Sequence, residues 1–156
     1  DDFLLRYIKT DPESLIKAEQ SFRKALALKE DYATAYYQLA LTLEQQNKMD
    51  GAIAELVKAL QRFPSDVTLK FELGRLYFNT GNVDQAARQF QEITTLLPNN
   101  SNALFSLAVS YERLGRPRKA LENYRRVLEL NPDNSSIRTK VAELERIVAQ
   151  EQSLPK

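Results

Sequence analysis

With 156 residues, of which 43% are hydrophobic and 28% charged, the chain has the length and apolar content of one folded domain. Its formal net charge of +1 leaves no global field that would attract nucleic acid or an acidic membrane. It contains no cysteine and no histidine, which excludes a disulfide framework, thiolate chemistry and the commonest metal ligand.

Helix-forming residues dominate the chain, and the first predicted elements lie before residue 33. Only 4 glycines occur among abundant Ala, Leu, Glu, Gln and Lys, which favours helix throughout. Residues 1–10 begin without Met and are apolar between 3 and 8, so we expect a short helix of non-standard register in a piece cut from a longer protein. The letters "DPE" from residue 11 are typical of a helix start, which predicts one helix within residues 11–32.

Three prolines divide the middle of the chain into segments of equal length. Pro64 and Pro98 lie 34 positions apart, and so do Pro98 and Pro132. A fixed period of this length is the signature of a repeat architecture. Each segment contains two helical patterns separated by a short break, and the segments are residues 33–66, 67–100 and 101–134.

Within each segment, small and large residues recur at the same places. A small residue in the first helix lets two backbones approach closely, and a large residue in the second helix fills the space beside it. Between the two helices stands a glycine or asparagine that suits a left-handed cap. In chain order these positions hold Ala40, Gly74 and Ala108 (small), Leu56, Phe90 and Tyr124 (large), and Asn47, Gly81 and Gly115 (cap).

The last predicted helix occupies residues 135–150. Ile137, Val141 and Leu144 form an apolar stripe that continues to Ile147 and Val148, and the opposite face is polar. Such a helix covers the last apolar face of a stack and presents a polar one to water. We therefore expect a C-terminal capping helix, followed by a frayed tail at residues 151–156.

These recurring positions, called columns here, resemble the pattern of the tetratricopeptide repeat family, which is W-x-x-L-G-x-x-Y, then A-x-x-x-F, then P. Residues 33–134 match three full repeats in register, and residues 11–32 match the second helix of a partial one. The resemblance implies an all-α, right-handed superhelical solenoid of antiparallel helix pairs. The partial repeat is matched at Ala18, Phe22 and Ala25, and the tryptophan column departs from the pattern with Tyr36, Lys70 and Leu104.

The resemblance also implies a concave groove, lined by the first helix of each pair, in which partners bind. Aromatic residues stand at the midpoint of these helices, 34 positions apart. Two interpretations stay open: the rings pack against a second helix, or their exposed faces bind a partner's side chains. Both hold if each ring is half buried. The candidate contact residues are Tyr37, Gln38, Leu41, Phe71, Glu72, Arg75, Phe78, Phe105, Val109 and Glu112.

One binding mode of the family is not expected here. Heat-shock co-chaperones with these repeats hold a C-terminal carboxylate with Lys, Asn and Arg side chains in defined groove columns. In this chain those columns hold Tyr37, Leu41, Glu72, Asn102 and Ser106, which do not form such a clamp. A groove of aromatic and aliphatic residues better suits an amphipathic helix or an extended apolar segment.

Residues 113–126 hold six arginines and lysines, which could contact an acidic partner or phosphates. Acidic residues interleave, however, and Arg118–Glu122 and Glu122–Arg126 are helical neighbours that can pair. Nucleic acid would also need stacking aromatic residues, and the only one on this helix, Tyr124, is expected to be buried. A solvated, internally paired face is the preferred interpretation.

The glycines show no phosphate-binding motif, and no acidic cluster has calcium-loop spacing. We therefore expect no enzyme activity, no catalytic residue, no metal and no cofactor. No apolar run approaches the ~18 residues that would span a bilayer, so no membrane insertion of this segment is expected. The prediction is a protein–protein interaction scaffold that binds a peptide or helix of a partner. The alternative is a spacer or self-association module, hence a homo-oligomer, within a larger protein such as a bacterial membrane-associated or envelope protein.

Overall fold

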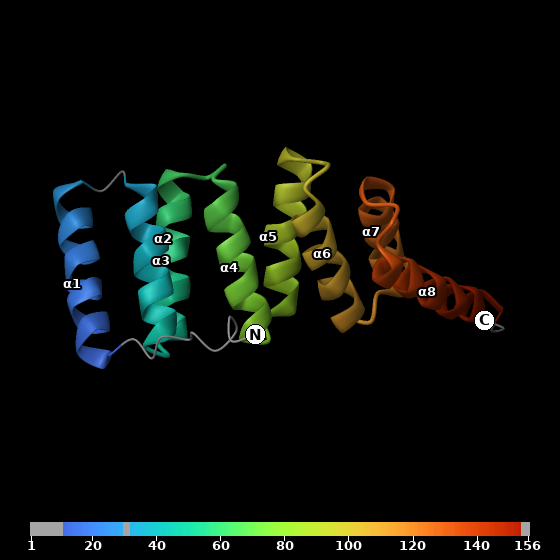
Figure 1. Cartoon of the computed structure of the whole chain (residues 1–156), viewed down its shortest axis with the longest axis horizontal. Coiled ribbons are helices and arrows are strands. Elements are labelled where there is room, and N and C mark those ends of the chain that lie inside the picture. The colour runs from blue at the N-terminus through green and yellow to red at the C-terminus, as the bar shows by residue number, and fades with distance from the viewer. Residues whose placement is uncertain (1–10, 30–31, 154–156) are drawn as a thin grey trace. The chain divides into compact units, whose positions relative to one another are not determined.

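The computed structural model describes residues 11–29 and 32–153. The short helix expected at residues 3–8 lies outside the described residues. Within them, all regular structure is helical (Figure 1), so the expected all-α class is confirmed. The helices are α1 (Pro12–Leu28), α2 (Ala33–Gln45), α3 (Met49–Arg62), α4 (Val67–Asn79), α5 (Val83–Leu96), α6 (Ser101–Arg113), α7 (Pro117–Leu130) and α8 (Ser135–Ser153).

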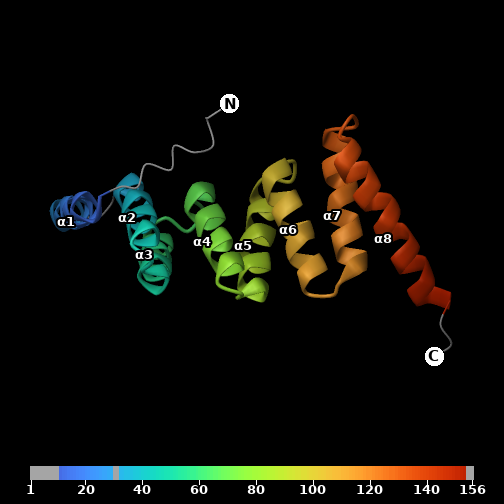
Figure 2. The ribbon, with the colours of Figure 1, turned by 60° about the horizontal axis from the view of Figure 1, so that its bottom comes forward.

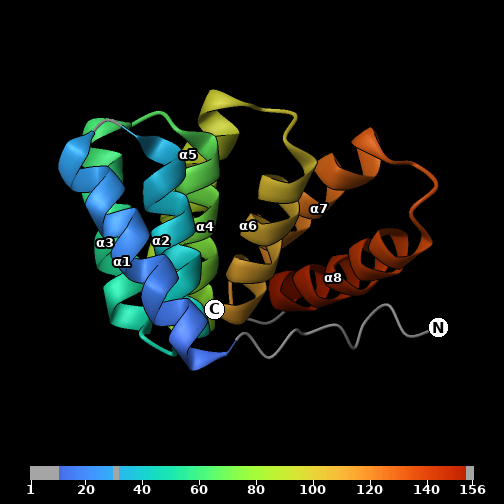
Figure 3. The same ribbon diagram turned by 60° about the vertical axis from the view of Figure 1, so that its left-hand side comes forward.

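The chain divides into two compact units, Asp1–Leu69 and Lys70–Lys156. In the first unit α1 packs on α2, as Figure 3 shows, and α2 packs on α3. In the second unit α5 packs on α6, α6 on α7, and α7 on α8. Figure 2 shows α6 and α7 side by side, joined by a short loop at one end. Each unit is thus a stack of consecutive helices.

Each proline-marked boundary ends one helix and starts the next by the same chemistry. Two residues after each proline stands an Asp or Asn whose side-chain Oδ1 accepts a hydrogen bond from the backbone N–H three residues later. The donor–acceptor distances are 2.9 Å at Asp66, 2.9 Å at Asn100 and 3.1 Å at Asn134. These are N-caps, which satisfy backbone donors that a helix start otherwise leaves without partners.

The turn inside each repeat adopts the predicted left-handed conformation. The φ angles are 59° at Asn47, 84° at Gly81 and 65° at Gly115. In all three turns the next residue's N–H donates to a carbonyl five residues back, at 2.8 Å. This six-to-one bond is the Schellman cap. The prediction of a glycine or asparagine cap is therefore confirmed.

The small and large columns pack as expected. A Cβ added to Gly74 would lie 2.8 Å from the Phe90 ring, closer than van der Waals contact allows. The large members of the second-helix column, Leu56, Phe90 and Tyr124, are buried. Glycine at 74 is thus required by a ring that lies directly against the α4 backbone.

The last helix lies against α7 and buries Ile137, Val141 and Leu144. It continues to Ser153, three residues into the segment expected as a tail. None of the helices in the described part of the chain combines the length and apolarity needed to cross a membrane.

Candidate functional site

A pocket with a volume of about 270 Å³ opens between α4, α5 and α6 in the second unit. Its lining is almost entirely apolar and contains five of the predicted contact residues. The other two are Ser106, which the sequence also places in the polar part of the groove, and Phe90, which the sequence assigns to packing between helices. The lining residues are Phe71, Arg75 and Phe78 from α4, Phe90 from α5, and Phe105, Ser106 and Val109 from α6.

Helical spacing explains why these side chains meet. Phe71, Arg75 and Phe78 are separated by four and then three positions, so they share one face of α4. Phe105 and Val109 share one face of α6 in the same way. Because α5 packs on α6 and the Phe90 ring lies against α4, that ring completes the lining.

The two aromatic groove residues of this unit are partly buried by ring packing. The Phe71 and Phe90 ring centroids lie 5.4 Å apart with the planes tilted by 58°. The Phe105 ring meets the Tyr124 ring edge-on at 5.9 Å, and the Phe105 side chain stays 44% exposed. The packing interpretation therefore holds for both rings, and part of each remains at the surface. Whether a partner uses that part stays a prediction.

Arg75 enters the pocket lining already paired with an acid. The Glu72 carboxylate is buried and accepts a hydrogen bond from Arg75 Nε at 3.0 Å, and it also pairs with Nη2. Glu72 is thus turned inward to Arg75, where sequence reasoning had expected a groove-facing acid. The pair offsets the charge of a guanidinium in an otherwise apolar wall.

Arg113 lies at the C-terminal end of α6, beside the pocket. Its guanidinium carbon is 5.1 Å from the centroid of the Phe78 ring, a cation–π contact that joins α6 to α4. The sequence placed Arg113 in the basic cluster of residues 113–126 and, by its spacing, also beside Glu112 in the groove, although it was not chosen as a candidate contact residue. That spacing is one helical turn after Val109, so Arg113 shares the pocket face of α6.

The remaining candidate of this unit, Glu112, has its carboxylate between three helices. Oε1 accepts a hydrogen bond from the Tyr124 hydroxyl at 2.6 Å, and Oε2 accepts one from Lys140 Nζ at 3.1 Å. Burial, reinforced by the Glu112 carboxylate, raises the pKa of Tyr124. The hydrogen bond to Glu112 raises the pKa of Lys140. Glu112 therefore links α6 to α7 and α8.

The other three candidates, Tyr37, Gln38 and Leu41, lie on α2 in the first unit and are each partly exposed. Thr42, which follows them, donates its hydroxyl to the Gln38 carbonyl at 2.8 Å.

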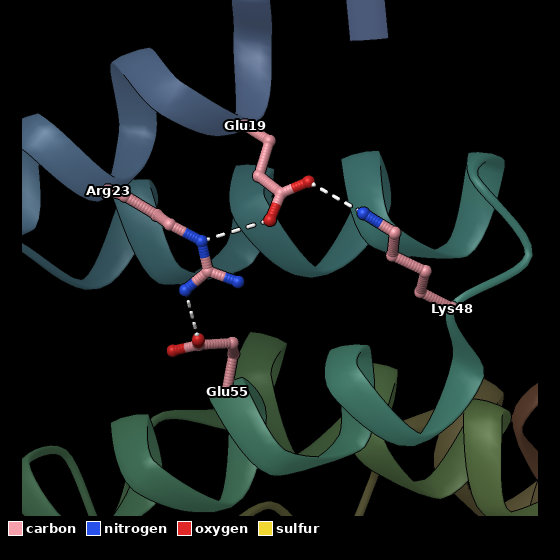
Figure 4. Close-up of polar contacts among 4 residues, drawn as sticks. All are labelled: Glu19, Arg23, Lys48 and Glu55. Carbon is pink, nitrogen blue, oxygen red and sulfur yellow. Dashed lines mark hydrogen bonds and ion pairs between the residues drawn. The ribbon is translucent and has the colours of Figure 1, made fainter. Parts of the chain in front are cut away.

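A charged cluster joins α1 to the first full repeat (Figure 4). Arg23 donates to Glu19 at 3.0 Å and to Glu55 at 2.7 Å, and Lys48 donates to the second Glu19 oxygen at 3.1 Å. Burial raises the pKa of Glu19, but the hydrogen bonds from Lys48 and Arg23 lower it by more, so the net pKa lies below the usual value. The hydrogen bond to Glu55 raises the pKa of Arg23. All four charges have partners, which indicates that the cluster has a structural role in holding α1 against the first full repeat.

Within the described residues, four of the six cations in the basic cluster of residues 113–126 form ion pairs, namely Arg116, Arg118, Arg125 and Arg126. The predicted Arg118–Glu122 and Glu122–Arg126 pairs are wrong. Arg118 meets Glu151 at 3.9 Å and Arg125 meets Glu145 at 2.7 Å, both on α8, while Arg126 meets Glu129 at 2.9 Å. The reason is that α8 packs on α7 and supplies acids that helical spacing cannot show. The predicted burial of Tyr124 is confirmed.

Comparison with known proteins agrees with this architecture. Models of the tetratricopeptide repeat family match residues 33–76, 71–135 and 105–145. The chain therefore belongs to the tetratricopeptide repeat family.

Among curated proteins, the chain is 32% identical over 92 residues to protein O-mannosyl-transferase Tmtc3 of Drosophila melanogaster, covering 58% of this chain and 10% of that protein. It spans about a tenth of the length of the curated relatives it matches.

Two solved structures show the likeness in fold. A tetratricopeptide repeat protein from Parabacteroides merdae has a TM-score of 0.79 and 21% identity, covering 92% of this chain and 57% of that one. YrrB, described as a repeat protein with an unusual peptide-binding site, has a TM-score of 0.67 and 24% identity, covering 86% and 67%.

Proposed function

We propose that this chain is a non-catalytic recognition module that binds a peptide or helix of a partner protein, with the α4–α6 pocket as its main anchor site. The observation that carries the proposal is the pocket itself, because five independently expected contact residues line it together. An apolar hollow rimmed by polar groups is the kind of surface that anchors an interface.

The size of the pocket favours a side chain over a whole small molecule. Its volume of about 270 Å³ falls below the range of roughly 300–1,000 Å³ typical of small-molecule sites. One large aliphatic or aromatic side chain would fill much of it, and burying such a side chain contributes about 1.5–3 kcal/mol. A partner segment would gain the rest of its affinity along neighbouring helices.

We place the remaining candidates in supporting roles. Tyr37, Gln38 and Leu41 are proposed contacts on α2 in the first unit. Glu72 is proposed to hold Arg75 in place, and Glu112 to hold α6 against the capping helix. Family membership and the peptide-binding site in the printed description of YrrB support recognition of a peptide by analogy.

The proposed ligand is an internal segment of its protein and not a free C-terminus. The columns that would form a carboxylate clamp hold residues such as Tyr37, Glu72 and Asn102, which do not supply the required set of cations. An apolar anchor does not require a chain end.

The test is a pull-down from an extract of the source organism with three forms of the chain. We expect the wild type to enrich a partner, and the double variant Phe71→Ala, Phe105→Ala to lose it while keeping its circular dichroism spectrum. The control is Ile147→Ala on α8, since Ile147 is 38% exposed and lies outside the pocket lining. Equal capture by all three forms would contradict the proposal.

Sedimentation of the chain at several concentrations tests the alternative function, self-association. A monomer at all concentrations argues against a homo-oligomer, whereas a dimer that the pocket variants disrupt would make a second copy the partner.

A further inference from the structure

We propose that the α4–α6 pocket selects a partner segment in which a large apolar residue is followed or preceded, within one helical turn, by a carboxylate that pairs with Arg113. This inference rests on the proposed function and specifies the partner chemistry of the same site.

The acids close to the pocket are already engaged. Glu72 holds Arg75 in the wall of the pocket. On α6, Glu112 accepts from both Tyr124 and Lys140. On α5, Asp84 pairs with Arg116 at 3.2 Å and Glu92 pairs with Lys70.

Arg113 is the cation left over beside the pocket. Its side chain is exposed, and its contact is with the face of the Phe78 ring. In the described part of the chain no carboxylate forms an ion pair with it. Another arginine on these helices, Arg88, lines a separate hollow that contains Asp84. The pocket region is therefore apolar within and positive at the α6 end.

The stacking of Arg113 on Phe78 prepares it for a carboxylate. A guanidinium is planar and weakly hydrated, and it presents paired N–H donors that match the two oxygens of an acid. Contact with the ring restrains the side chain before a ligand arrives, which reduces the entropy lost on binding. Because Phe78 itself lines the pocket, an acid bound to Arg113 would lie next to an apolar anchor in the same segment.

The test is a selection of short linear peptides displayed by fusion through their C-terminus, so that none presents a free carboxylate. The whole chain is the bait, in the wild type and in Arg113→Gln. We expect wild-type selection to enrich a large apolar residue with Asp or Glu within one helical turn. Arg113→Gln should keep the apolar preference and lose the acidic one. Arg146→Gln is the matched control, since Arg146 is an exposed arginine on α8, which does not line the pocket.

The best peptide is then synthesised with acetylated and amidated ends, and its Kd is measured by fluorescence anisotropy. Arg113→Gln should weaken binding by about two- to fivefold, the range of an exposed ion pair. Replacing the peptide's acid by its amide should have the same effect, and both changes together should add nothing further. Arg113→Lys should fall between, because it keeps the charge and loses the planar fork.

The outcomes separate the inference from the proposed function. Enriched peptides without an acidic preference, or with one that survives Arg113→Gln, overturn the inference and leave the pocket as an apolar anchor site. The double variant Phe71→Ala, Phe105→Ala serves as a further bait. If it enriches the same peptides as the wild type, the proposed function fails and the inference fails with it.

Discussion

The α4–α5 and α6–α7 repeats use the same two columns in different ways. In the first, Gly74 has no side chain and the Phe90 ring lies against the α4 backbone. In the second, Ala108 occupies the glycine column, and Tyr124 carries a hydroxyl that donates to Glu112 at 2.6 Å. The α4–α5 helix pair is joined by close approach of a ring to a backbone. The α6–α7 pair adds a hydrogen bond to Glu112, which also accepts one from Lys140 on α8. The repeat pattern thus specifies size at these positions and leaves polarity free.

This difference also decides where the pocket lies. Phe90 is buried by α4 yet reaches the pocket lining. Its counterpart Tyr124 is covered edge-on by Phe105 and is bonded to Glu112. The large residue on α5 therefore lines the surface pocket, while the large residue on α7 lies at the junction between α6 and the capping helix. Substitutions at matched columns should have different consequences.

The largest effect should come from removing the ring on the close-approach side. Phe90→Ala deletes a buried phenyl group and leaves a cavity, so we expect the free energy of unfolding of the second unit to fall by about 3–5 kcal/mol. Urea denaturation followed by circular dichroism measures it. A loss below about 1 kcal/mol would mean that α4 and α5 do not depend on this contact.

On the hydrogen-bonded side, Tyr124→Phe should cost about 1–1.5 kcal/mol, since the ring stays and only the bond to Glu112 is lost. Tyr124→Phe combined with Glu112→Gln should cost less than the sum of the single changes, because the two groups act on one bond. Strict additivity in the same denaturation experiment would contradict the shared bond.

The two repeats should also differ in alkaline solution. The pKa of Tyr124 is raised above its ordinary value of 10.0 by burial and by Glu112. Because the folded state holds this proton more tightly, the associated stability is present below pH 10 and is lost as the pH rises further. We expect the wild type to lose up to about 1 kcal/mol more per pH unit in this range than Tyr124→Phe does. Parallel profiles of the two proteins would exclude this titration.

The smallest expected effect is at the glycine itself. Gly74→Ala gains about 1 kcal/mol of helix propensity and costs about 1–3 kcal/mol of overpacking against Phe90, so a net loss of about 1 kcal/mol is expected. In a Phe90→Leu background the same change should be neutral or stabilising. If Gly74→Ala destabilises equally in both backgrounds, the ring is not the reason for the glycine.

Periodicity was sufficient to predict the repeats and much of the pocket. Residues such as Phe71 and Phe105 could be placed on one surface because their spacing equals that of the prolines. Local chemistry likewise predicted the caps at Asn47 and Gly115, since only a few residue types tolerate positive φ.

Interactions that depend on how helices pack were not predictable from spacing. The α8 acids that pair with Arg118 and Arg125 are supplied by a neighbouring helix, not by sequence neighbours. Glu112 was expected at the groove, and its bond to Tyr124 depends on the packing of α6 on α7. Spacing placed Arg113 in the groove beside Glu112, but its contact with the Phe78 ring on α4 depends on how the two helices pack.

The caps at Asp66, Asn100 and Asn134 have a consequence for how such a chain can grow. Each follows a proline by two residues, so the same proline and N-cap pattern precedes residue 67 and ends the segment 67–100. A tandem duplication of the segment 67–100 would add a whole helix pair. Every helix start would keep its cap and every loop its length. The gene could therefore gain or lose units by unequal recombination while every junction in the product keeps its local chemistry.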